Sequence, residues 1–333
     1  MGTRIPALSF CLLLSLAVFA QQERQPSPEP NPSAEPAKAS EAAPANVPEN
    51  SPKPDLTPDA NGKLSQEQMQ QLFRVVAAKD LENDKLQRNY TYIERQVESK
   101  LDKKGETKSS EVHTYEILEI YEEQVQRLIA KDDKPLNAKD AAKEEEKIQK
   151  IIDKRKNESE DEHRKREEKE EKEREDDRKF VTEIADAYDF KLVGAEAVNG
   201  REAWVIDGEP RPGFQPHMKE AKFLPKFHGR VWIDQGDLQL AKMDVECLDT
   251  ISWGLFLARF HKGSRFMLEQ TRVNDEVWLP LQLAVKVDAR LALLKSLDVD
   301  IEQSFRDYKK FRTSSKIVGV GEVPDSKEVP DPK

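Results

Sequence analysis

Residues 190–207 read FKLVGAEAVNGREAWVID, a segment in which a two-residue turn separates two strand-like runs. The turn is Asn199-Gly200, and this pair favours the left-handed backbone conformations that a tight hairpin needs. Both runs contain the branched or aromatic residues that are common in strands. The segment therefore predicts an antiparallel hairpin with strands over 190–198 and 201–207.

The chain after this hairpin repeats the pattern of short runs and tight turns. Residues 209–227 contain four prolines and are expected to form a loop. Further turn signals are Gln235-Gly236 and the triplet 274–276. Between these breaks we predict strands over 231–234, 238–248, 265–273, 277–287 and 299–308.

The chain before the hairpin begins its ordered part with a helix. Apolar residues recur at helical spacing from Leu64 to Leu81. The pattern predicts a helix over 65–86, with Ser65 as the N-cap and Gln68 three residues later. The next runs predict strands over 89–97, 112–120 and 124–130.

These elements define the expected fold class. About ten strands, most of them neighbours in sequence, favour an antiparallel meander over a parallel sheet with helical crossovers. We therefore expect an α+β fold in which helices cover a curved antiparallel sheet, an unclosed β-barrel. This half-barrel domain would occupy residues 62–320 and include a long charged helical insertion over 138–188.

The insertion contains the most charged segment of the chain. Residues 139–179 carry 15 basic and 17 acidic side chains, many with the acid four residues before the base. Apolar residues are few, and Ile148, Ile151 and Ile152 do not recur at a coiled-coil spacing. The pattern favours a self-supporting helix surrounded by solvent. The alternative is a spacer or an arm that docks on a partner.

The two ends of the chain differ from its middle. Residues 1–20 have a basic start and a short apolar run, which predicts a signal peptide cleaved after Ala20. The alternative is a retained N-terminal anchor. Residues 21–61 are rich in proline and polar residues and are expected to be a disordered linker, and residues 321–333 a similar tail.

Composition excludes several classes of protein. Of 333 residues, 35 % are charged, and the mean hydropathy is -0.80. A protein with several membrane spans is excluded, and we expect no span in the mature chain. The net charge of -10 argues against nucleic-acid binding, which needs clustered cations. After loss of Cys11 with the signal peptide, Cys247 alone remains, so no intramolecular disulfide is expected.

Catalytic and metal-binding motifs are not found in the sequence. It has no phosphate-binding loop, dinucleotide fingerprint, nucleophile elbow, HExxH or CxxC. The five histidines do not have the spacing of metal ligands. We expect no enzyme activity, no cofactor and no metal. A hydrolase whose residues lie far apart in sequence remains an alternative.

The longest apolar run of the mature chain, ISWGLFLARF over 251–260, suggests a ligand site. It would form either a loop or short helix covering the core, or one wall of an apolar cavity that accepts a lipid chain. Tryptophans on strands are the other candidates, although such residues more often pack in a core. The candidate ligand-binding residues are Trp204, Trp232, Trp253, Leu255, Phe256 and Phe260.

Four short segments occur in a familiar order. They are GREAWVI (200–206), GRVWID (229–234), VWLP (277–280) and FRDYKKF (305–311). In this order they resemble outer-membrane lipoprotein-sorting proteins, the superfamily of the Lol lipoprotein carrier. The resemblance covers 190–312, with 64–130 as the first half of the domain. It implies an unclosed antiparallel barrel with a helical lid that binds acyl chains without catalysis.

Two hypotheses for function follow. The first is an exported, non-enzymatic protein of the periplasm or cell envelope that binds a lipid or a lipoprotein acyl chain. The second is an envelope interaction or sensor module, with the same fold and the charged helix as its docking arm for a protein partner. Neither hypothesis involves nucleic acid.

Overall fold

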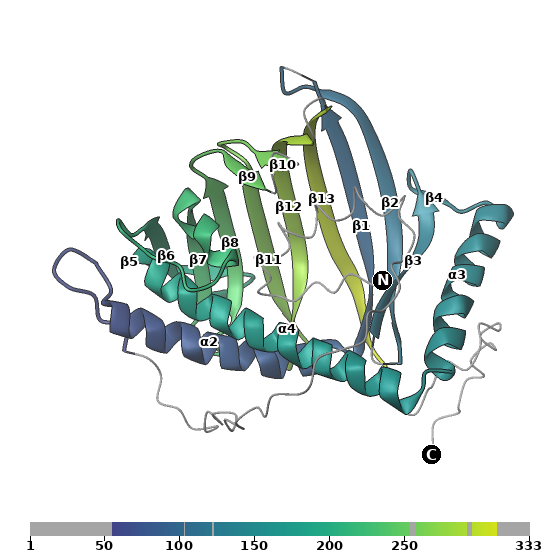
Figure 1. Ribbon diagram of the computed structural model, residues 1–333, viewed down its shortest axis with the longest axis horizontal. Helices are drawn as coiled ribbons and strands as arrows, with labels where there is room; N and C mark the ends of the chain where they lie inside the picture. Colours follow the sequence, from purple (N-terminus) through teal and green to yellow (C-terminus); the bar gives the residue numbers. More distant parts are fainter. Residues whose placement is uncertain (1–54, 103, 122, 254–257, 292–294, 312–333) are drawn as a thin grey trace, which may run out of the picture.

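The computed structural model describes residues 55–102, 104–121, 123–253, 258–291 and 295–311. Within these ranges thirteen strands form one antiparallel sheet. Eleven of them follow in the order β4-β3-β2-β1-β13-β12-β11-β8-β7-β6-β5 (Figure 1). Their bounds are β1 (Tyr90–Leu101), β2 (Thr107–Ile120), β3 (Glu123–Lys131), β4 (Lys134–Pro135), β5 (Tyr188–Val198), β6 (Arg201–Pro210), β7 (Phe227–Asp234), β8 (Leu240–Cys247), β11 (Arg265–Val273), β12 (Val277–Leu291) and β13 (Lys295–Lys310).

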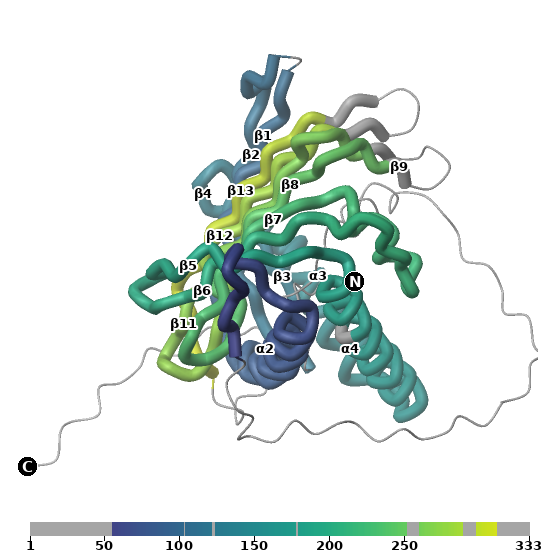
Figure 2. The backbone as a smooth tube through the Cα atoms, turned by 90° about the vertical axis from the view of Figure 1, so that its left-hand side faces the viewer, coloured from purple at the N-terminus to yellow at the C-terminus, as the bar shows by residue number. Residues whose placement is uncertain are grey.

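The sheet curves but does not close. Its edge strands β4 and β5 do not pair with each other, and Figure 2 shows the sheet arching over the helices. The helices are α2 (Gln66–Gln87), α3 (Ala138–Lys156) and α4 (Glu160–Ala187), with a short 3-10 helix, η1 (Glu220–Lys226). The expected α+β fold, an unclosed antiparallel barrel with helices against it, is confirmed.

The predicted hairpin at residues 190–207 is present. Asn199 and Gly200 have φ angles of 50° and 79°, and β5 and β6 pair from Val198 and Arg201 outward. The first helix also begins as predicted. The Ser65 side chain accepts from the Gln68 backbone N–H, and the Gln68 side chain accepts from the Ser65 backbone N–H.

The first and last strands of the chain meet in the middle of the sheet. β1 pairs with β13, so β1–β4 extend to one edge and β12 back to β5 extend to the other. The segment between β4 and β5 must therefore cross from one edge to the other. The expected charged insertion is in fact this crossover, made of α3 and α4.

The crossover is two helices, and parts of both are buried. Asn157 ends α3, and Ser159 begins α4 with its own capping box. Ile148 and Ile152 of α3 are buried against Ile120 and Val125, at the end of the sheet formed by β2 and β3. The prediction of one helix surrounded by solvent is wrong here, because these isoleucines share one face of α3 and cover apolar residues.

A network of charges joins the two helices. Glu158, in the break, pairs with Arg155 at 3.1 Å and with Arg166 at 3.2 Å. Arg166 also pairs with Glu170 at 3.5 Å. These four side chains are only 11–16 % exposed, unlike most ion pairs along α4. The network fixes the angle at which α3 meets α4.

Two loops predicted from the sequence contain regular structure. The proline-rich segment 209–227 was expected to be a loop, but η1 forms within it because Ala221 and Leu224 pack into the core. Segment 251–260 was expected to contain a loop or short helix. Its described ends are strands instead, β9 (Ile251–Trp253) and β10 (Ala258–Phe260), because they pair with each other and β10 also pairs with β12.

Several predictions concern residues outside the described ranges. These are the signal peptide over 1–20, most of the linker over 21–61 and the tail over 321–333. The last part of that linker, residues 55–61, is described, and its Leu56 is buried in the core cluster. Among the described residues, none of the helices combines the length and hydropathy required to cross a membrane. In the same ranges, no three histidine, cysteine or acidic residues are arranged to hold a metal ion.

Candidate ligand-binding face

The sheet has two apolar faces that differ in extent. Alternation along β6 places Trp204 and Ile206 on one face and Ala203 and Val205 on the other. We call the first the inner face, since it is the face over which α2 and α4 lie. The buried apolar residues that strands contribute to it include Tyr92, Ile117, Ile206, Ile233, Leu240, Phe266, Leu268, Leu283, Val285, Val287 and Phe305.

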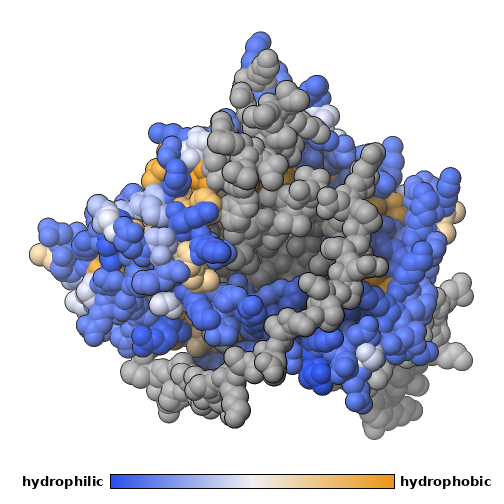
Figure 3. Space-filling model, viewed as in Figure 1, coloured by the Kyte–Doolittle hydropathy of each residue, from blue (hydrophilic) through white to orange (hydrophobic). Residues whose placement is uncertain are grey.

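The helices cover the lower part of this face. Met69, Leu72 and Val76 of α2 and Val181 of α4 join the same apolar cluster. Figure 1 shows both helices crossing the lower ends of the strands, and η1 lies against the same face beside β6 and β7. In Figure 3 the surface along the lower part of the view is mostly hydrophilic in colour, and hydrophobic colour appears in patches to its upper left and right. The roof over the apolar face is thus partial among the described elements.

Side-chain contacts hold the helices that cover the inner face, here called the roof, at the end near β5. The buried Glu183 of α4 accepts hydrogen bonds from the backbone N–H groups of His217 and Met218, at 2.9 and 3.0 Å. The Tyr188 hydroxyl, at the end of α4, donates to the Leu224 carbonyl of η1 at 2.7 Å. Phe73 of α2 meets Phe190 edge-on, with ring centroids 5.3 Å apart. These contacts keep α4, η1 and α2 in one layer.

The predicted ligand-binding residues do not all lie together. Trp204 is half-buried on the inner face, and half-buried Phe260 of β10 packs against the same cluster. Trp253 belongs to β9, and β9 pairs with β10. Leu255 and Phe256 lie outside the described residues. Of the six candidates, Trp204 and Phe260 are therefore the two whose side chains are seen at the inner face.

Trp232 lies on the outer face, away from Trp204. It pairs with Val205 across β6 and β7 and packs with Trp278 in a separate cluster. Its indole Nε1 donates to Glu196 at 2.9 Å, and the Lys242 ammonium lies 5.0 Å from its ring centre. Along the paired strands the two tryptophans are offset by one residue position. Side chains alternate between the two faces of a sheet, so this offset places the tryptophans on opposite faces.

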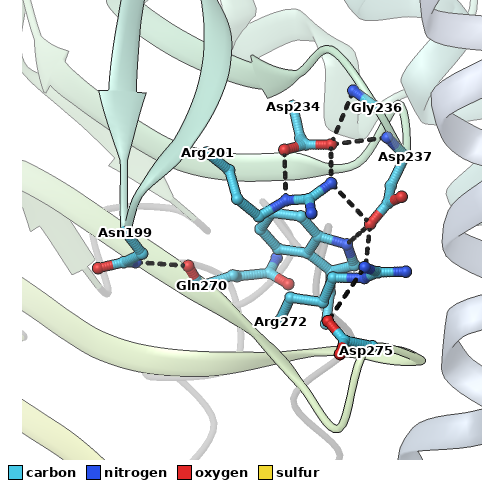
Figure 4. A network of polar contacts seen from close by, with 9 residues as sticks. Asn199, Arg201, Asp234, Gly236, Asp237, Gln270, Arg272 and Asp275 are labelled. Carbon is cyan, nitrogen blue, oxygen red and sulfur yellow. Dashed lines mark hydrogen bonds and ion pairs between the residues drawn. The ribbon is translucent and has the colours of Figure 1, made fainter.

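A polar network surrounds the second tryptophan of that face (Figure 4). Arg201 donates two hydrogen bonds to the buried Asp234, both at 2.8 Å, and its guanidinium lies 5.5 Å from the Trp278 ring centre. Asp237 accepts from the Trp278 indole at 2.9 Å and pairs with Arg272 at 2.9 Å. All these groups satisfy one another, so the network stabilises the turns at this end of the sheet.

An acidic side chain on the inner face was missed in the sequence. Glu94 of β1 is 0 % exposed, and burial raises the pKa of its carboxyl to about 7. It accepts from the side-chain amides of Gln303 at 2.7 Å and Gln126 at 3.2 Å. The alternation Tyr90, Tyr92, Glu94 along one strand face was the available signal, since it places a carboxyl where apolar residues are expected.

An open cleft at the start of α2 has a different character. Its lining includes Asp59, Lys63, Asp189 and Arg211. Lys63 and Arg211 both pair with Asp189, at 3.1 and 3.3 Å. Its cations are therefore neutralised within the chain, and its polar lining does not suit an acyl chain.

Comparison with known proteins gives matches among solved structures alone. No family model matches the chain, and no curated protein matches it. A putative outer membrane lipoprotein-sorting protein domain from Vibrio parahaemolyticus is similar over 72 % of this chain and 92 % of its own, with 8 % identity and a TM-score of 0.32. A LolA superfamily protein from Nitrosomonas europaea is similar over 73 % and 96 %, with 9 % identity and a TM-score of 0.28.

A third structure is a DUF1329 family protein from Desulfovibrio piger. It is similar over 75 % of this chain and 95 % of its own, with 12 % identity and a TM-score of 0.26. Two of the three structures are described as lipoprotein-sorting or LolA-superfamily proteins.

Proposed function

We propose that this chain is an exported, non-enzymatic protein of the periplasm or cell envelope that binds the acyl chain of a lipid or lipoprotein against its inner face. The observation that supports this is the apolar inner face itself. It runs across the sheet from β6 to β2, while the described helices cover its lower part. An alkyl chain can lie on such a surface without any polar partner.

The binding energy would come from burial of the alkyl chain. Each buried methylene contributes about 0.8 kcal/mol, which corresponds to roughly a fourfold change in affinity. Half-buried apolar residues on the inner face, including Trp204, Val231, Met243 and Ile301, would contact the chain. The sheet would supply the wall of the site, and α2 and α4 would cover part of it.

The test is a chain-length series with the full protein as it is exported. Binding of 1-octanol, 1-decanol and 1-dodecanol is measured by quenching of tryptophan fluorescence and by calorimetry. We expect the dissociation constant to fall about fourfold per added methylene. Equal affinities along the series, or no binding of any of them, would overturn the proposal.

A pair of variants on one strand locates the site. Ile301 is half-buried on the inner face of β13, and its neighbour Glu302 is exposed. We expect Ile301→Asn to weaken 1-dodecanol binding at least tenfold, because it places an amide on the apolar wall. Glu302→Gln is the matched control and should bind as the wild type does. Equal affinities for the two variants would place the site elsewhere.

A further inference from the structure

Glu94 occupies an unusual position for a carboxyl group. It lies in the middle of β1, directly opposite Phe305 of β13 and Tyr115 of β2, and all three belong to the inner face. Its side chain is fully buried. A carboxyl in such surroundings must be neutral or be matched by a partner, since burying an unpaired charge is costly.

Three glutamines surround this carboxyl. Gln303 donates to one Glu94 oxygen at 2.7 Å, and Gln126 donates to the other at 3.2 Å. Gln303 also donates to the side-chain oxygen Oε1 of Gln96 at 3.2 Å. All three glutamines are half-buried, so the buried acid lies beneath amides that remain partly accessible. We call these four residues the Glu94 patch.

The Glu94 patch contains no positive charge. Among the described residues, its hydrogen bonds come from amides, and no lysine, arginine or histidine forms an ion pair with Glu94. The ionisable groups that face it are Tyr92 and Glu98 on β1 and His113 and Tyr115 on β2. His113 lies directly opposite Gln96, and its ring centre is 6.1 Å from that of Tyr115. None of these groups forms an ion pair with Glu94, so an ionised Glu94 is left without a paired cation among the described residues.

We infer that the Glu94 patch binds the amine of an amphipathic ligand, with Glu94 as the counter-ion and the glutamine amides as further hydrogen-bond partners. This rests on the proposed function, because the alkyl part of the same ligand would lie on the inner face. An ammonium group fits the patch, since it donates hydrogen bonds and supplies the missing charge.

The inference carries a definite pH dependence. Burial raises the pKa of Glu94 to about 7, so the free protein holds this carboxyl partly protonated at neutral pH. An ammonium binds the ionised carboxylate and lowers that pKa. Amine affinity should therefore rise as pH increases from 6 to 8, whereas the affinity for an alcohol should not. The neighbouring tyrosines stay neutral in this range, since burial raises their pKa values further.

The experiment compares three probes on the full-length protein at pH 6 and pH 8, by calorimetry. They are dodecylamine, 1-dodecanol and butylamine. Together they separate the contribution of the amine's charge to affinity from that of the alkyl chain. At pH 8 we expect dodecylamine to bind about tenfold more tightly than 1-dodecanol, the usual gain from a charged hydrogen bond. The preference should shrink at pH 6, and butylamine should bind much more weakly than dodecylamine.

Two variants test the role of the residue. Glu94→Gln keeps the shape of the side chain and one of its two acceptor oxygens, and should reduce the preference for dodecylamine to near unity. Glu98→Gln is the matched control, two residues along the same strand and half-buried, and should keep the preference. Should Glu94→Gln fail to fold, the pH comparison on the wild type and on His113→Gln still tests the site, because the pH dependence should survive loss of the imidazole that faces the patch.

Each contrary result points to a distinct failure. Equal binding of dodecylamine and 1-dodecanol at pH 8 would overturn the amine site and leave the proposed function intact. Equal loss of preference in both variants would reveal general attraction to an acidic protein and also overturn the amine site. If neither dodecyl probe binds, the proposed function fails and the inference fails with it.

Discussion

At the scale of single residues, the interface between α2 and α4 contains an acid that resists ionisation. Asp80 of α2 is half-buried, and burial together with nearby Asp84 and Asp177 raises its pKa to about 7. In the unfolded chain an aspartate has a pKa near 3.9. Between pH 4 and pH 7 the folded state thus binds more protons, and Asp80 makes the protein less stable as pH rises through this window.

We predict that Asp80→Asn stabilises the protein at pH 8. The amide cannot ionise, so the cost of burying the charge disappears, and the melting temperature should rise. The gain should diminish as pH falls from 7 to 4, where wild-type Asp80 is protonated in the folded state. Thermal melts followed by circular dichroism at pH 4, 6 and 8 measure this. Glu82→Gln, an exposed change on the same helix, is the control, and a gain larger at pH 4 than at pH 8 would contradict the prediction.

A second single-residue feature attaches α2 to the sheet. The buried Asn83 side chain accepts from the Trp278 backbone N–H at 2.7 Å and donates to the Trp278 carbonyl at 2.9 Å. Gln87 donates to the same carbonyl at 2.9 Å. Asn83 and Gln87 therefore form hydrogen bonds with backbone groups at the start of β12. Without these two side chains the backbone groups would be unpaired.

We predict that Asn83→Ala destabilises the fold by about 1–3 kcal/mol, the usual cost of leaving a buried polar group without its partner. The Trp278 N–H loses its acceptor, whereas its carbonyl keeps Gln87. Urea unfolding provides the measurement. Gln71→Ala changes an exposed residue of the same helix and should have little effect. Equal midpoints for the two variants would show that the contact is dispensable.

At the scale of elements, α3 protects the edge of the sheet. Its Glu144 side chain accepts from the Leu128 N–H at 3.3 Å, and its Lys147 side chain donates to the Gln126 carbonyl at 3.4 Å. Both backbone groups belong to β3, beyond the short stretch where β4 pairs with it. Covered edges cannot pair with other chains, so α3 reduces the risk of aggregation.

We predict that the isoleucines of α3 make unequal contributions to stability. Ile152→Ala empties a buried site against β2 and β3 and should cost about 2–4 kcal/mol. Ile151→Ala, at a half-buried position one residue away, should cost clearly less. Urea unfolding midpoints distinguish the two. Similar small losses would mean that α3 is surrounded by solvent, as its charge pattern alone suggests.

At the scale of the whole molecule, the charged segment connects the two edges of the sheet. Eleven strands at about 4.8 Å spacing give the sheet a width of roughly 48 Å measured along its curve. With 28 residues at 1.5 Å rise, α4 is about 42 Å long. Its length therefore suits the width that it crosses, and its i,i+4 ion pairs support the exposed part of the helix. The crossover accounts for the charged helices without a binding partner.

We predict that deletion of residues 139–179 abolishes folding, because the remaining chain is too short to join the two edges. Replacing residues 160–175 by a Gly/Ser segment of equal length should preserve the sheet, since a flexible chain of that length together with α3 can still make the connection. Far-ultraviolet circular dichroism and cooperative urea unfolding measure both. A folded deletion variant with native sheet content would refute the crossover.

Local patterns were sufficient for most strands and for the first helix of this protein. Alternating residues, the Asn199-Gly200 turn and the Ser65 cap each act within a few residues, so the strands, the hairpin and α2 could be predicted. The antiparallel arrangement followed because neighbouring strands with short turns pair with each other. Residues with only local partners behave as their sequence suggests.

Long-range contacts decided the remainder. The pairing of β1 with β13 turned the apparent insertion into a crossover, and packing against the end of β2 and β3 buried the isoleucines of α3. The same pairing brought Glu94 beside Gln303, 209 residues away, and the register across β6 and β7 placed Trp204 and Trp232 on opposite faces. These contacts join residues that are far apart in the chain. The sequence alone does not show which distant residues come together after folding.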